Sequence, residues 1–221
     1  MGIIFFILFI IVPINCFAGF EAIIPYYNSV SGTTYNEVVS CRDAQTTFYS
    51  GLELAANARF GGPITNNSGS AQCISRIDFD IFYESAGGDP TGNSYYAEIW
   101  TAQTTTSKGK TYVWPAAKQG TSDAIDGSAI PADTPDWVSF YFPSCVTIND
   151  ATQYVLFIHT SDYTGTEIID FEFTSGCAGD QWRVGCSEAT PDPLSSGAAS
   201  AYCTSAINPS RALRAVLYVT P

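Results

Sequence analysis

Short stretches of alternating apolar and polar residues run along most of this chain. In the clearest of them, positions 77, 79, 81 and 83 are apolar or aromatic, whereas positions 76, 78 and 80 are charged. A period of two is typical of a β-strand with one buried face. The same alternation predicts strands at 95–101, 137–142, 169–173 and 213–219. The nearly continuous apolar run at 154–159 predicts a central strand that is covered on both faces.

Clusters of turn-forming residues separate these stretches. Gly, Pro, Asp, Asn and Ser gather at 87–93, 123–135, 160–165 and 186–199. The one segment that favours a helix, Gly51–Arg59, is short. Many short strands between turns predict an all-β fold, a two-sheet antiparallel jelly-roll-like sandwich.

The first 18 residues have a composition of their own. Met1–Ala18 contain an apolar run without charge, followed by the small-residue pattern Cys16-Phe17-Ala18. This pattern predicts a secretory signal peptide, with an uncleaved membrane anchor and lipidation at Cys16 as the alternatives. After cleavage we expect an extracellular or cell-surface protein that is not held in a membrane.

The remaining chain of about 200 residues suits one compact domain. Within residues 19–221, we expect an N-terminal extension and first strands at 19–57, followed by the sandwich at 58–221. The extension contains Phe20–Tyr35, which is rich in Ile and Tyr and could supply an extended strand to a second copy of the chain.

Six of the seven cysteines follow the predicted cleavage site, in a compartment that favours oxidation. None of them has C-x-x-C spacing, so three disulfides are expected rather than a zinc site. Their connectivity is open, although local pairing within the last three is one arrangement. They are Cys41, Cys73, Cys145, Cys177, Cys186 and Cys203.

The charge balance excludes one class of partner. The net charge is −12, and only 14% of the residues are charged. Nucleic-acid binding needs a basic surface, so a nucleic-acid partner is not expected.

Several segments resemble a known family in their order and spacing. These segments are Ala58–Phe60, Ile74–Phe79, Gly88–Asn93, Tyr96–Thr101, Asp136–Phe142, Val146–Ile148 and Gln153–Ile158. Together they resemble the choice-of-anchor domains, jelly-roll modules of secreted and surface proteins, over about residues 60–219. The resemblance implies a non-enzymatic extracellular module that attaches, displays or binds at a surface.

Aromatic residues are the strongest indication of a ligand. Flat rings stack on sugar rings through apolar contact, although core packing is the competing explanation for each of them. The candidates for an aromatic platform are Tyr96, Trp100, Tyr112, Trp114, Trp137 and Trp182.

Two turns offer oxygen ligands for a structural calcium ion. Asp89 and Asn93 share one Gly-rich loop, and Asp123 and Asp126 share another. Ordinary turn chemistry, in which Asp and Asn side chains bind the local backbone, also explains them. No cofactor is required by this interpretation.

A hydrolase is the least favoured class. The pairs Asp78/Asp80 and Asp170/Glu172 have the i, i+2 spacing that places two carboxylates about 7 Å apart on one strand face. His159, the only histidine, follows an apolar strand and is expected to be structural.

Taken together, these observations predict a secreted, non-catalytic sandwich protein for surface display, adhesion or carbohydrate binding. Its expected partners are glycans or components of a cell surface or matrix. The alternative is a structural subunit of an extracellular filament or sheath.

Overall fold

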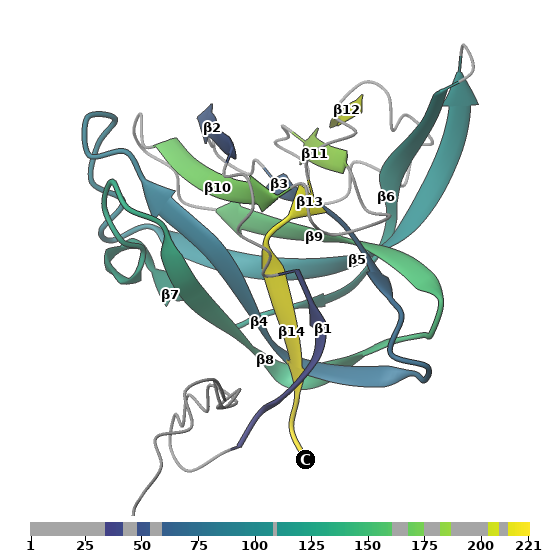
Figure 1. Cartoon of the computed structure of the whole chain (residues 1–221). Coiled ribbons are helices and arrows are strands. Elements are labelled where there is room, and N and C mark those ends of the chain that lie inside the picture. Colours follow the sequence, from purple (N-terminus) through teal and green to yellow (C-terminus); the bar gives the residue numbers. More distant parts are fainter. Residues whose placement is uncertain are drawn as a thin grey trace, which may run out of the picture.

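The fold is an all-β sandwich of two antiparallel sheets (Figure 1). The computed structural model describes residues 34–41, 48–53, 59–107, 110–160, 168–174, 182–186, 203–207 and 212–221. The predicted signal peptide and most of the N-terminal extension lie outside these residues. Among the helices of the described part, none has the length and apolar character needed to cross a membrane.

Sheet 1 has seven strands, with β4 at its centre. Its main path runs β1-β14-β4-β10-β13, β8 pairs with the other side of β4, and β2 pairs with β10. The strands are β1 (Asn36–Ser40), β2 (Phe48–Glu53), β4 (Gln72–Tyr83), β8 (Asp136–Ile148), β10 (Ile168–Thr174), β13 (Ala212–Leu213) and β14 (Ala215–Val219).

Sheet 2 also has seven strands, in the order β12-β11-β3-β9-β5-β6, with β7 paired to β5. They are β3 (Arg59–Asn66), β5 (Ser94–Ser107), β6 (Lys110–Thr121), β7 (Ile125–Asp126), β9 (Thr152–Thr160), β11 (Trp182–Cys186) and β12 (Cys203–Ile207). One short 3-10 helix, η1 (Gly127–Ala129), follows β7.

The core lies between the sheets, where the apolar positions predicted from the alternation meet. Phe171 of β10 in sheet 1 lies edge-to-face against Phe60 of β3 in sheet 2, with ring centroids 4.8 Å apart. Phe79 of β4 packs edge-to-face on Phe171 and on Phe140 of β8. Each fully buried ring of this kind stabilises the fold by about 1.5–3 kcal/mol.

The predicted central strand is confirmed. Residues 154–158 of β9 are all buried, and β9 pairs with β3 on one side and β5 on the other. The two faces of β9 serve different clusters. Leu156 and Ile158 join the main core, while Val155 and Phe157 pack with Trp100 on the opposite face.

The predicted helix at Gly51–Arg59 is wrong. Residues 51–53 belong to β2, which pairs with β10 in register from Phe48 to Glu53, and Arg59 begins β3. Pairing with a neighbouring strand outweighs a weak local helix preference. Residues 54–58 lie outside the described part of the chain.

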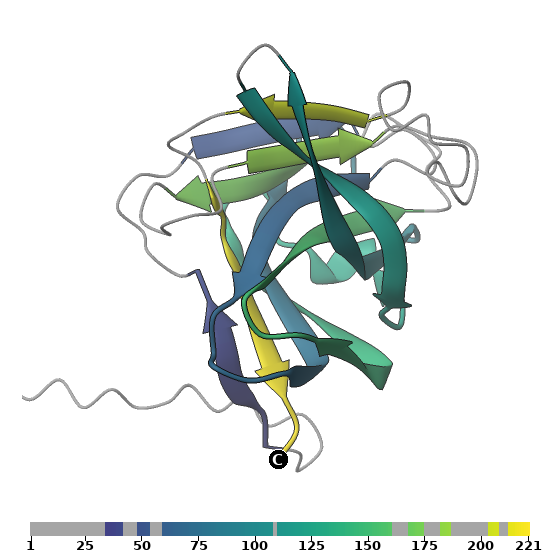
Figure 2. The same cartoon turned by 90° about the vertical axis from the view of Figure 1, so that its right-hand side faces the viewer.

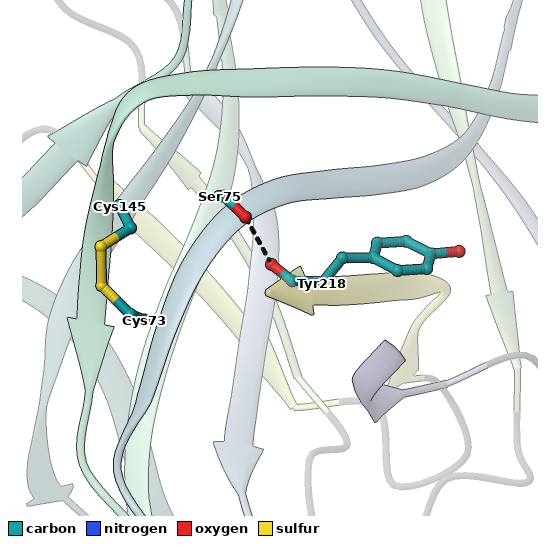
Figure 3. Close-up of a disulfide and its surroundings, with 4 residues drawn as sticks. All are labelled: Cys73, Ser75, Cys145 and Tyr218. Carbon is teal, nitrogen blue, oxygen red and sulfur yellow. Dashed lines mark hydrogen bonds between the residues drawn. A yellow bond between two sulfur atoms is a disulfide. The ribbon is translucent and has the colours of Figure 1, made fainter. Parts of the chain in front are cut away.

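A disulfide joins β4 to β8. Cys73 and Cys145 are bonded across this pair of strands, with Cα atoms 5.2 Å apart (Figure 3). Beside them the Ser75 hydroxyl donates a hydrogen bond to the Tyr218 carbonyl of β14, at 3.4 Å. The same end of β4 is therefore tied to both of its neighbours.

The other cysteines are described only in part. Cys41 is also disulfide-bonded. Cys186 of β11 and Cys203 of β12 are register partners in adjacent antiparallel strands. Cys177 lies outside the described residues, so the remaining connectivity stays a prediction.

Sheet 2 curls strongly at one end. The hairpin of β5 and β6 rises above the rest of sheet 2 (Figure 1) and passes in front of β11 and β12 in Figure 2. Backbone of β6 comes close to both β12 and β11. Lower down, Gly120 of β6 lies under Val146 of β8, where a Cβ atom would come within 2.3 Å of that side chain. This close approach brings the edges of the two sheets together.

Candidate functional site

The outer face of sheet 2 carries a cluster of charged and aromatic side chains. We call it the Glu98 cluster and define it by six residues from four adjacent strands: Arg59 (β3), His159 (β9), Tyr96, Glu98 and Trp100 (β5), and Lys118 (β6). Strand pairing explains why they meet. Arg59 is the register partner of His159, which is itself the partner of Tyr96. Because directly opposed residues point to the same side of a sheet, the three lie in one row.

Glu98 is the centre of the cluster and is only 1% exposed. Arg59 donates two hydrogen bonds to its carboxylate, at 2.7 and 3.3 Å, and Trp100 Nε1 donates a third at 2.8 Å. Lys118 Nζ lies 3.4 Å and His159 Nδ1 lies 3.6 Å from Oε1. One carboxylate is thus shared among three basic side chains.

The partners of Glu98 keep it ionised. Burial raises the pKa of its carboxyl, but the hydrogen bond and charge of Arg59, the charge of His159 and the Trp100 hydrogen bond outweigh burial. The net result is a pKa below the usual value. The carboxylate therefore holds its cationic neighbours in fixed positions at neutral pH.

An apolar patch adjoins the cluster on the same face. Trp100, Val113, Val155 and Phe157 are buried together, and Trp114 packs against them half-buried. Trp100 lies edge-to-face on Phe157, with 6.3 Å between ring centroids. Arg59 and Lys118 also approach the Trp100 ring, at 5.7 and 6.0 Å from its centroid.

Only some side chains of this face are exposed to solvent. The Lys118 side chain is 41% exposed and that of His159 is 14% exposed. Tyr96 is half-buried and packs against the His159 ring, with centroids 5.9 Å apart. Glu98 and Arg59 lie beneath these residues and hold them in place.

Most of the predicted aromatic platform falls in sheet 2. Tyr96 and Trp100 lie on β5, Tyr112 and Trp114 on β6, and Trp182 on β11, whereas Trp137 lies on β8 of sheet 1. Trp100 is 2% exposed, so it supports the face from below. The side chains of Tyr112 and Trp182 lie outside the described part of the structure.

The outer face of sheet 1 is organised differently. Arg76 of β4 donates to both carboxylate oxygens of Asp78, at 2.8 and 2.6 Å. The Arg76 guanidinium also packs on the rings of Tyr35, Tyr141 and Tyr218, at 5.2, 5.9 and 4.0 Å from their centroids. Each charge in this arrangement has one opposite partner.

A second pair repeats this arrangement further along β4. Arg214, between β13 and β14, forms an ion pair with Asp80 and lies 5.2 Å from the centroid of the Trp137 ring. Trp137 is the register partner of Asp80 and is half-buried. Asp78 and Asp80, considered above as a carboxylate pair, are therefore each held by an arginine.

Asp170 of β10 is the most perturbed carboxyl on this face. Burial raises its pKa to about 7, with a further contribution from Glu84. Within the described part of the chain its Oδ1 has no hydrogen-bond partner, and the residue is 2% exposed. The raised pKa is what a general acid needs, but a substrate has almost no access to this side chain in the structure. The Glu172 side chain lies outside the described part.

The predicted calcium loops are occupied by turn hydrogen bonds. Asp89 Oδ1 accepts from the Thr91 amide at 2.9 Å, and Asp126 accepts from the Ser128 and Gly92 amides at 2.8 and 3.2 Å. These bonds lower the pKa of both carboxyls. The Asn93 carbonyl accepts from the Gly127 amide, so these two loops are brought together.

Asp123 contributes to a different contact, through its backbone amide to the Tyr141 carbonyl. Among the described side chains, no group of three His, Cys, Asp or Glu residues is arranged to hold a metal ion. Calcium binding stays a prediction.

Sequence reasoning did not connect Arg59, Glu98, Lys118 and His159. An available signal was Glu98 itself, an acidic residue within the strand predicted at 95–101. A charge in a strand that is buried on both faces requires a partner from elsewhere in the chain.

The fold defines the class of this protein as an all-β sandwich of two antiparallel sheets, stabilised by at least the Cys73–Cys145 disulfide. Comparison with protein family models, with curated proteins and with solved structures found no match for this chain.

Proposed function

We propose that this protein is a secreted, non-catalytic carbohydrate-binding module that acts in adhesion or display at a cell surface or matrix. The resemblance of several sequence segments to choice-of-anchor domains supports this proposal. The outer face of sheet 2, around the Glu98 cluster, is the proposed binding face. Its proposed ligand is a glycan, and its setting is extracellular.

One observation carries the proposal. Half-buried aromatic rings, Tyr96 and Trp114, lie on the same sheet as polar groups whose positions are fixed by a buried carboxylate. Sugar recognition uses the same combination, because ring faces supply apolar contact and a few fixed polar groups set orientation. Fixed groups also reduce the entropy lost on binding.

The five nitrogen atoms around the Glu98 carboxylate, from Arg59, Trp100, Lys118 and His159, need no rearrangement to remain in place. Arg59 is held on Glu98 by two hydrogen bonds and Trp100 by one, so Lys118 and His159 are supported from beneath. A preorganised face of this kind suits a weakly interacting ligand such as a glycan, whose affinity depends on several small contacts.

Single substitutions on the two faces test the proposal. Tyr96→Ala removes a ring that packs on His159 in the Glu98 cluster, and Trp114→Ala removes one that packs against the patch around Trp100. Trp137→Ala removes a half-buried ring of the same size as Trp114 from sheet 1. Retardation of each variant would be measured in native gels that contain soluble neutral or acidic polysaccharides.

We expect Trp114→Ala and Tyr96→Ala to weaken binding by about tenfold, because stacked aromatic contacts contribute about 0.5–1.5 kcal/mol each beyond their buried area. Trp137→Ala should bind as the unaltered protein does. Loss of binding on Trp137→Ala alone would move the site to sheet 1. The absence of retardation by every polysaccharide would remove the proposal.

A structural subunit of a filament or sheath is the second candidate. The observation that favours it is the position of β1, which lies at the end of sheet 1 and pairs with β14 within the described strands. Edge strands are templates for pairing with a second chain. Tyr35, the last residue of the segment Phe20–Tyr35, packs beside Tyr141 on sheet 1, with 5.7 Å between ring centroids.

This second candidate predicts assembly that depends on the N-terminal segment. Light scattering of the secreted protein, with and without residues 19–33, measures that dependence. Concentration-dependent growth that disappears on truncation would support a subunit, and a monomer in both forms would exclude it.

A further inference from the structure

We infer that the ligand of the sheet 2 face is an anionic polysaccharide, one whose sugars carry carboxylate or sulfate groups. This inference rests on the proposed carbohydrate-binding function and names its substrate class. It is carried by the distribution of charge between the sheets and by the position of Lys118 in the Glu98 cluster.

The four adjacent strands β3, β9, β5 and β6 of the binding face differ in charge from the rest of the chain. Glu98 is their only acidic residue. Within the Glu98 cluster, Arg59, Glu98 and Lys118 together carry +1, whereas the whole chain carries −12. A locally positive face attracts anions, while the acidic remainder of the protein repels other copies of the chain.

The local geometry concentrates that positive charge. Arg59 and Glu98 balance one another through two hydrogen bonds, so the ammonium group of Lys118 adds a further positive charge beside this pair. The Lys118 side chain is 41% exposed, whereas that of Glu98 is 1% exposed. The excess charge therefore faces solvent.

Lys118 also stands next to an aromatic ring. Its Nζ lies 6.0 Å from the centroid of Trp100 and 3.4 Å from Glu98 Oε1, which fixes its direction. Tyr96 lies half-buried on β5, the strand of Trp100, and Trp114 lies half-buried on β6, the strand of Lys118. A sugar ring that contacts an aromatic residue here would place a carboxylate or sulfate substituent within reach of the ammonium group.

The test compares polymers that differ in charge. The probes are polygalacturonate and its fully methyl-esterified form, which has the same backbone without the charge, and dextran sulfate against neutral dextran. The secreted full-length protein is titrated with each polymer at low and at high ionic strength. We expect the charged polymer of a pair to bind about tenfold more tightly at low salt, with the difference reduced at high salt.

The two pairs separate the two sources of charge. Preference for polygalacturonate over its ester would assign a carboxylate ligand, and preference for dextran sulfate over dextran would assign a sulfate ligand. Equal binding within both pairs would overturn the inference but leave the proposed function standing. If no polysaccharide binds at all, both fail.

Two lysines of β6 provide matched variants. Lys118→Gln should reduce binding to the charged polymer about fivefold, a larger loss than for its neutral counterpart, as expected for the loss of one exposed ion pair. Lys110→Gln makes the same charge change eight positions away, about 26 Å along the strand, and should have no such effect. Equal losses in the two variants would indicate nonspecific attraction and overturn the inference.

A third variant reverses the charge at the same position. Lys118→Glu places a like charge beside Glu98 and should abolish the preference for the charged polymer altogether. Thermal unfolding of each variant checks that the fold persists, which the partial exposure of Lys118 leads us to expect. Binding of the charged polymer by a folded Lys118→Glu protein at the original strength would also overturn the inference.

Discussion

The outer faces of the two sheets both contain buried charges, but they combine them in different ratios. On sheet 1 two buried aspartates each have their own arginine, Arg76 for Asp78 and Arg214 for Asp80. On sheet 2 a single carboxylate, Glu98, has three basic neighbours. The charges balance within each aspartate–arginine pair, whereas the shared carboxylate has Lys118, a partly exposed base, among its neighbours.

The sequences of the strands carry the same difference. The strands of sheet 1 contain seven acidic residues and one basic residue, Arg76, whereas those of sheet 2 contain two acidic residues, Glu98 and Asp126. The composition of the whole chain hides this asymmetry. A net charge of −12 describes the molecule as a whole and not the face that we propose for binding.

Glu98→Gln should have the largest effect on the difference between the two faces, because it removes the carboxylate on which the sheet 2 cluster depends. It leaves Arg59 and its basic neighbours together without a buried counter-charge, and the loss of one partner of a buried pair costs about 3–5 kcal/mol. The free energy of unfolding in urea at pH 7 measures the loss. Glu37→Gln, at an exposed position of β1, is the control and should change stability little.

The effect of Glu98→Gln should also depend on pH. Since the folded-state pKa of Glu98 is lowered, its ionised form stabilises the fold above the unfolded-state pKa of about 4.5, and this contribution disappears as pH falls through the folded-state value. The two proteins should therefore become similar in stability under acidic conditions. A difference that is constant with pH would show that the carboxylate charge is not the cause.

Removing the disulfide sharpens the contrast between the sheets. The double variant Cys73→Ala/Cys145→Ala opens a loop that spans 72 positions of sequence, and we expect a loss of about 2–4 kcal/mol. Amide hydrogen exchange should rise first in β8 and the adjoining end of β4. Equal acceleration in β5 and β9 would mean that the bond stabilises both sheets together.

Asp170→Asn should stabilise sheet 1 in a pH-dependent way. Burial raises the pKa of Asp170 to about 7, so the ionised form is penalised in the folded state. Stability from the protonated form is complete below pH 3.8 and is lost as pH rises through about 7. Removal of this buried negative charge should raise stability at pH 8 by about 1–3 kcal/mol, with little change at pH 4. Thermal melting at the two pH values measures this, and a gain at pH 4 that equals the gain at pH 8 would refute it.

Lys118→Gln should have the smallest effect on stability, within about 0.5 kcal/mol, since exposed ion pairs contribute little. Urea unfolding at neutral pH is the measurement. A large destabilisation would place Lys118 among the residues that maintain the fold and weaken its assignment to a ligand.

Much of the fold was accessible from the sequence because burial imposes a simple period on a strand. The alternation at 76–83 and the continuous run at 154–159 identified β4 and β9 correctly. Long-range pairing was not accessible. Because of such pairing, residues at both ends of the predicted helix Gly51–Arg59 belong to two different strands. Pairing also continues β6 through Pro115, which is tolerated because β6 lies at the edge of sheet 2.

The candidate site was predicted only in its aromatic part. Arg59 is 39 positions and Lys118 is 20 positions from Glu98, and only sheet topology brings them together. Local spacing cannot reveal a cluster whose members come from four strands. The four residues added by the structure, Arg59, Glu98, Lys118 and His159, are the ones that give the face its charge.

The sequon Asn66-Asn67-Ser68 illustrates a motif whose meaning changes in three dimensions. Asn66 is completely buried, and its amide donates to the carbonyls of Ser70 and Ile148, at 2.9 and 3.1 Å. Its Oδ1 accepts from the amide and hydroxyl of Ser68, at 3.1 and 2.7 Å. The sequence pattern forms a turn in which no room is left for an attached sugar.

The pairing of β1 with β14 has a mechanical consequence for the adhesive role that we propose. Asn36 lies opposite Val219 and Ser40 opposite Val216, so the chain enters and leaves sheet 1 at the same end (Figure 1). Tension applied between these two points would act at right angles to the strands. Such tension would separate β1 from β14 one residue pair at a time. A load applied between β14 and a strand of sheet 2 would instead act on the sandwich without pulling β1 away from β14.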